Sequence, residues 1–66
     1  RRQKRAWLVR EVMAAPGLPS AELLHRLNAE ERKAGRDGVA DGEFDSIMAD
    51  LAREGFFRFE GDGWFA

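Results

Sequence analysis

Residues 41–55, DGEFDSIMADLAREG, are the stretch that determines the fold. Four apolar side chains recur there at i, i+3, i+4 and i+7, namely Phe44, Ile47, Met48 and Leu51. This spacing places them on one face of a helix. Asp41 can accept hydrogen bonds from the free amides of the first turn, and Gly55 can adopt the left-handed conformation that ends helices. The stretch therefore predicts an amphipathic helix over residues 41–54, with Asp41 as its N-cap.

An aromatic segment with a central turn follows this helix. Residues 56–60, FFRFE, and residues 64–65, WF, flank a Gly-Asp-Gly sequence at positions 61–63. Aromatic residues favour strands, and Asp-Gly tolerates the backbone angles of tight turns, so we predict a β-hairpin. A loop at residues 61–62 places Phe59 opposite Trp64, whereas a loop at residues 62–63 shifts the register by one. Both registers agree with the sequence.

Two further helices are expected before residue 41. The first spans residues 3–15, ends at Pro16-Gly17, and carries one broad apolar stripe made of Leu8, Val9, Val12, Met13 and Ala15. The second begins with Ser20 as its N-cap, buries Leu23, Leu24 and Leu27, and can continue to residue 34 before Gly35. Between them, residues 17–19 are long enough for a short extended segment that could pair with the hairpin.

Composition describes one small domain over residues 1–66. The chain has no cysteine, which excludes disulfides and thiolate zinc sites, so its apolar helix faces, five phenylalanines and two tryptophans must form the core. No apolar run approaches the roughly 20 residues that span a bilayer, and no signal peptide is visible. The sequence begins with Arg1 rather than methionine, so it can be a fragment of a longer protein. The absence of cysteine fits a cytoplasmic location.

The residues of known catalytic and metal-binding motifs are missing. The sequence contains no GxxxxGK, GxSxG or HExxH pattern. The single histidine, His25, lies off the leucine face of its helix, so we expect it in solvent. Three acids near the start of the third helix, Asp41, Glu43 and Asp45, fit capping and the helix dipole better than a metal site. We therefore expect no enzyme activity, no cofactor and no metal.

The order of elements resembles a winged helix-turn-helix domain, a mainly α fold with a small β-hairpin. The residues that carry the resemblance are 20–24 (SAELL), the apolar set of residues 44–51, and 54–57 (EGFF) followed by the aromatic hairpin. The resemblance implies DNA binding, with the third helix in the major groove and the hairpin on the backbone, in a regulator or DNA-processing protein.

The charge distribution modifies that expectation. The net charge is −1, from eleven basic and twelve acidic residues. Cations dominate the first ten residues, whereas the segment 41–54 has five acids and Arg53 as its single cation. A helix led by carboxylates repels phosphates, so a basic arm would have to supply the contacts. The DNA-contact candidates are the basic side chains and one exposed serine: Arg1, Arg2, Lys4, Arg5, Arg32, Lys33, Arg36, Ser46, Arg53 and Arg58.

The alternative is a winged helix that binds protein. Its acidic third helix would face a basic partner through Glu43 and Asp50, or the domain would dimerise through its first helix or hairpin. Trp7 lies off the apolar stripe of the first helix, so it either packs under the hairpin or the C-terminus, or anchors a partner. Trp64 is the second aromatic candidate. Of the two functions, DNA binding is the first expectation.

Overall fold

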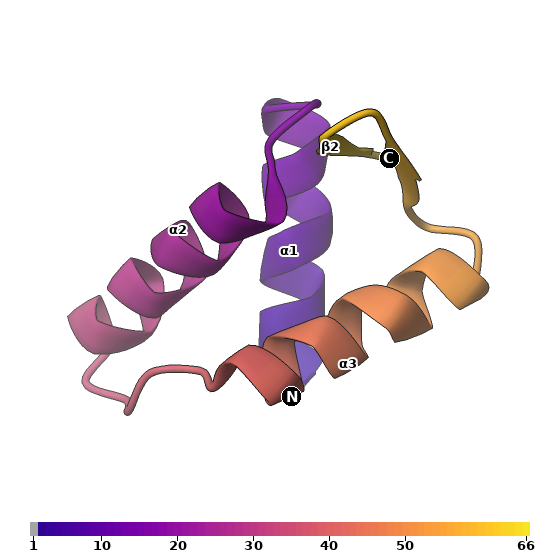
Figure 1. Ribbon diagram of the computed structural model, residues 1–66. Coiled ribbons are helices and arrows are strands. Elements are labelled where there is room, and N and C mark those ends of the chain that lie inside the picture. The colour runs from indigo at the N-terminus through magenta and orange to yellow at the C-terminus, as the bar shows by residue number, and fades with distance from the viewer. Residues whose placement is uncertain (1) are drawn as a thin grey trace.

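Three helices are followed by a two-stranded antiparallel hairpin in a computed structural model, which describes residues 2–66 and the side chains from Gln3 onward (Figure 1). The helices are α1 (Arg2–Ala14), α2 (Ser20–Lys33) and α3 (Asp41–Arg53), and the strands are β1 (Arg58–Glu60) and β2 (Gly63–Phe65). The predicted α+β class is confirmed, and the order of elements is compatible with a winged-helix layout. None of the helices described is both long and apolar enough to cross a membrane.

Helix α3 has the predicted buried face but a different cap. Its four apolar side chains are buried, and Gly55 after it has a φ of 89°. The prediction that Asp41 caps the helix was wrong: Ala40 occupies the N-cap position, and no side chain caps the first turn. The Ala40 carbonyl accepts from Phe44 N at 3.0 Å, so Asp41 is already the first helical residue. There its carboxylate faces the positive end of the helix dipole without bonding to it.

Helix α2 likewise begins one residue earlier than expected, because Ser20 is already its first helical residue. Pro19 is the N-cap residue, and its carbonyl accepts from the amides of Glu22 and Leu23, both at 3.1 Å. The prediction of Ser20 as the N-cap was therefore wrong. The Ser20 hydroxyl instead accepts a hydrogen bond from Nε1 of Trp64 at 2.8 Å, which joins the start of α2 to the hairpin.

The hairpin adopts the first of the two registers. Phe59 pairs with Trp64, and the loop is formed by Gly61 and Asp62, with Gly61 at a φ of 59°. The short extended segment expected before α2 is confirmed, because Leu18 forms a β-bridge with Trp64. Trp64 N donates to Leu18 O at 2.9 Å, and Gly17 N donates to Trp64 O at 2.8 Å. The turn after α1 therefore acts as a third, very short strand beside β2.

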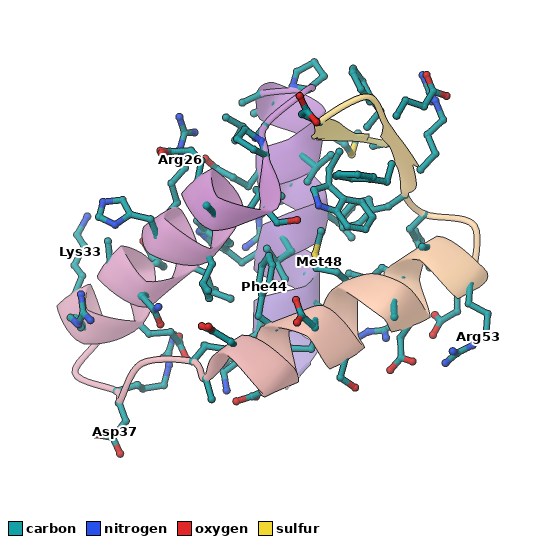
Figure 2. The ribbon with its side chains drawn as sticks, viewed as in Figure 1. Arg26, Lys33, Asp37, Phe44, Met48 and Arg53 are labelled. Atoms are coloured by element: carbon teal, nitrogen blue, oxygen red, sulfur yellow. The ribbon has the colours of Figure 1, made fainter. Side chains whose placement is uncertain are left out.

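The core lies where the three helices converge on one another. Figure 2 shows Phe44 and Met48 pointing from α3 into the space between the helices. The buried apolar residues are Leu8, Val12, Leu23, Leu27, Val39, Phe44, Ile47, Met48, Leu51 and Phe57. Three predicted members of the α1 stripe are missing from this core: Met13 is 66% exposed, and Val9 and Ala15 are only half-buried. Val39 and Phe57 join it from the loops that flank α3.

Candidate functional site

The basic side chains near the N-terminus face the acidic helix. Lys4 Nζ donates to Glu43 Oε2 at 2.8 Å and lies 3.9 Å from Glu31 Oε1. The Arg5 guanidinium donates to both carboxylate oxygens of Glu54, at 2.6 and 3.3 Å. Two of the predicted DNA contacts are thus engaged with acids at or just after α3. Arg1 lies outside the described residues, as does the side chain of Arg2.

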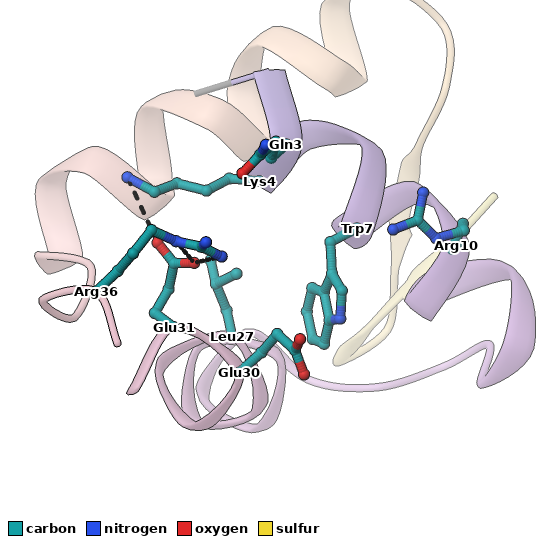
Figure 3. Close-up of a pocket in the computed structure, with 8 residues that line it drawn as sticks. All are labelled: Gln3, Lys4, Trp7, Arg10, Leu27, Glu30, Glu31 and Arg36. Carbon is teal, nitrogen blue, oxygen red and sulfur yellow. Dashed lines mark hydrogen bonds and ion pairs between the residues drawn. The ribbon is translucent and has the colours of Figure 1, made fainter. Parts of the chain in front are cut away.

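Glu31 is the centre of a second group of charges. Its carboxylate is 2% exposed, and Arg36 donates to it from Nε at 2.8 Å and lies 2.5 Å away through Nη2. The hydrogen bond from Arg36 is the main cause that lowers the pKa of Glu31 below its ordinary value. Figure 3 shows these groups at one end of a cavity of about 220 Å³ between α1 and α2.

Two further DNA candidates also have intramolecular partners. Arg53 forms an ion pair with Asp50 on the preceding turn of α3. Arg58 donates to Glu60 Oε2 at 2.6 Å, and its guanidinium carbon lies 5.2 Å from the centre of the Phe65 ring.

Few of the described basic side chains lack an ion pair. Among the side chains of residues 3–66, three cations have no ion pair with an acid: Arg10, Arg32 and Lys33. Arg32 and Lys33 are adjacent and exposed at the C-terminal end of α2 (Figure 2 labels Lys33). They are the predicted DNA candidates whose charge is not matched locally.

The outward face of α3 is acidic and polar. Asp41, Asp45, Ser46 and Ala49 are exposed along it, while Glu43 and Asp50 are half-buried. The exposed cation of this helix, Arg53, is the partner of Asp50. This face therefore presents carboxylates without a matching excess of positive charge.

The surroundings of Trp7 differ from those expected, whereas Trp64 lies opposite Phe59, as the first of the two predicted registers required. Trp7 is half-buried between α1 and α2, where it lines the cavity together with Leu27 and Glu30 (Figure 3). The expectation that it packs under the hairpin or the C-terminus was therefore wrong, because its side of α1 faces α2. Trp64 is held in place by its bond to Ser20 and by the rings of Phe57 and Phe59, at 6.0 and 4.9 Å between centroids. His25 is exposed, as predicted.

An apolar groove that was not predicted from the sequence lies along α1. One hollow is lined by Arg5, Ala6, Val9, Arg10, Leu51 and Phe56, and a second by Val9, Val12, Met13, Pro16, Phe56 and Ala66. Because the hollows share Val9 and Phe56, they form one continuous surface, which we call the α1 groove. Phe56 is 50% exposed in it, and Met13 also lies at its edge. The available sequence signal was the pair Phe56-Phe57, because adjacent residues of an extended segment point to opposite sides.

Comparison with models of protein families, with curated proteins and with solved structures finds no match for this chain. Within the described residues, no group of three or more histidine or acidic side chains is placed to hold a metal ion.

Proposed function

We propose that this chain is a winged-helix module for protein interaction, and that a partner docks in the α1 groove. The observation that carries this proposal is the exposure of Phe56 and Met13 at 50% and 66% around a continuous apolar lining. Contiguous apolar surface on a small domain is typical of binding sites, and aromatic side chains supply much of the binding energy at interfaces.

The position of Phe56 supports its role as an anchor. Gly55 N donates to Ala52 O at 3.1 Å, and Phe56 N donates to Leu51 O at 2.9 Å, so the backbone before the ring is held on the end of α3. The next residue, Phe57, is buried in the core. Because the backbone on both sides of Phe56 is already ordered, little backbone freedom is lost when a partner binds its ring, and this favours affinity.

The charges of α3 favour a protein partner over DNA for this helix. Its outward face carries Asp41 and Asp45, and the nearby cations Lys4 and Arg5 are already paired with Glu43 and Glu54. Binding phosphates through these two cations would require breaking those pairs, and the exposed carboxylates would add repulsion.

Selection of binders from a displayed library of helical peptides tests the proposal. We expect peptides that bind the wild-type chain and lose at least about ten-fold in affinity when Phe56→Ser removes the anchor. The matched control is Phe59→Ser, because Phe59 is 52% exposed but lies on the hairpin outside the groove. Circular dichroism verifies that both variants fold. Equal losses in the two variants, or no binder that depends on Phe56, would contradict the proposal.

Nucleic-acid binding is the second candidate, and one observation favours it. Arg32 and Lys33 are adjacent, exposed and without an ion pair among the described side chains, so they can contact phosphates at no cost in broken pairs. Titrating random-sequence duplex DNA at increasing salt tests this function. Replacing both residues with alanine should make the salt dependence shallower by about 2 in log–log slope. Arg58→Ala, which removes a cation paired with Glu60, is the control. Absence of binding by the wild-type chain at low salt would rule out this candidate for the domain.

A further inference from the structure

We propose that the occupant of the α1 groove is an acidic amphipathic helix of a different protein, whose carboxylate pairs with Arg10. This inference rests on the proposed function and specifies the chemistry of the partner. Three observations support it: the unpaired charge at the edge of the groove, the groups that line the groove, and the poor fit of a second copy of the chain as its occupant.

Arg10 supplies the charge that selects the partner. Its side chain is exposed on α1, lines the groove, and has no ion pair among the side chains of residues 3–66. The other cation on the lining, Arg5, is neutralised by Glu54 at 2.6 Å. No acidic side chain lines either hollow. The groove thus combines an apolar floor with one unmatched positive charge, to which a carboxylate beside apolar side chains is complementary.

The lining favours a helix over an extended peptide. The groove runs along α1 from Ala6 past Val9 and Arg10 to Met13, which is about two helical turns. The backbone groups of α1 bond within the helix, Phe56 N is bonded to Leu51 O, and Pro16 has no amide hydrogen. An added strand would therefore find neither the interior of α1 nor the Phe56 and Pro16 amide positions able to donate a hydrogen bond to it. A helix satisfies its own backbone and presents apolar anchors at i, i+4 and i+7.

A second copy of the chain fits the groove poorly. In a two-fold contact centred on this part of α1, the unmatched Arg10 of each copy would approach the other, and like charges repel. The acidic face of α3 in a second copy could pair with Arg10, but that face carries no large exposed apolar side chain that could fill the groove. The large apolar side chains exposed among the described residues are Met13, Phe56 and Phe59, and none of them lies on α3.

The test uses displayed helices with an apolar stripe and with glutamate, glutamine or lysine varied at the positions that flank it. We expect selection on the wild-type chain to enrich glutamate at one flank. The selected glutamate peptide should bind Arg10→Glu at least about ten-fold more weakly, and the same peptide with lysine at that flank should recover binding to Arg10→Glu. The control is Arg32→Glu, which reverses another unpaired exposed cation outside the groove and should leave affinity unchanged.

The outcomes separate this inference from the proposed function. Peptides that need Phe56 but show no preference for glutamate and no loss with Arg10→Glu would overturn the acidic partner while leaving the groove as a docking site. Absence of any peptide that depends on Phe56 would overturn both. Sedimentation equilibrium supplies the third outcome: a dimer that Phe56→Ser dissociates would assign the groove to a second copy and overturn the inference.

Discussion

The carboxylate of Glu31 is the buried charged group among the described residues, and Arg36 is its main partner. Glu31→Gln keeps the size of the side chain but removes the charge from this hydrogen bond. We expect the free energy of unfolding at pH 7 to fall by about 1–2 kcal/mol, measured by urea denaturation. Glu30→Gln is the control on the same helix, because Glu30 forms no ion pair in the described structure, and its effect should stay within about 0.5 kcal/mol. Equal effects would contradict a stabilising role for Glu31.

The same interaction makes stability sensitive to acid. Arg36 lowers the pKa of Glu31 in the folded state, so the stabilisation is complete above the unfolded-state value of about 4.3. It is lost as the pH falls through the lowered folded-state pKa. We expect the difference in stability between the wild-type chain and Glu31→Gln to shrink progressively below about pH 4.3. Urea denaturation at successive pH values measures it, and a difference that grows in acid would show that the pKa shift has the opposite sign.

Asn28 holds the loop between α2 and α3 through a hydrogen bond that was not predicted from the sequence. Its Oδ1 accepts a hydrogen bond from the Val39 amide at 2.5 Å, which positions the buried Val39 side chain. Asn28→Ala should lower the free energy of unfolding by about 1–2 kcal/mol, because the amide loses its partner. Asn28→Asp retains an acceptor oxygen and should recover most of that loss in the same urea measurement. If the two variants are equally unstable, the hydrogen bond is not the cause.

At the scale of elements, the contact between β2 and the turn after α1 depends on a glycine. A Cβ atom on Gly63 would overlap the carbonyl oxygen of Gly17, whereas one on Gly42 in α3 would meet nothing within 4 Å. Gly63→Ala should therefore lower the free energy of unfolding by about 1–3 kcal/mol, because the added methyl group overpacks this contact. Gly42→Ala should raise the free energy of unfolding by at most about 0.5 kcal/mol, because alanine has the higher helix propensity. Thermal unfolding of both variants measures the contrast, and a Gly63→Ala variant as stable as the wild-type chain would contradict this close approach.

Across the whole molecule, one continuous core predicts a single cooperative unfolding transition. Trp7 reports on the contact of α1 with α2, and Trp64 reports on the hairpin. In Trp7→Phe the fluorescence comes from Trp64, and in Trp64→Phe it comes from Trp7. Within each variant, we expect the fluorescence midpoint in urea to coincide with the midpoint from far-ultraviolet circular dichroism. A hairpin that melts before the helices would separate the two midpoints in Trp7→Phe.

The sequence by itself determined the helices, the buried face of α3 and the location of the hairpin, because periodicity, glycine and turn preferences act over a few residues. Tertiary structure decided the hairpin register and the roles of Ser20 and the tryptophans. It also decided the partners of the charges, since Lys4 meets Glu43 across 39 residues and Arg5 meets Glu54 across 49. The candidate groove belongs to this second group: Phe56 and Phe57 are chemically identical, and only the tertiary packing selects which ring is buried and which remains exposed. These contacts join residues far apart in the chain, so the pattern of neighbouring residues in the sequence cannot predict them.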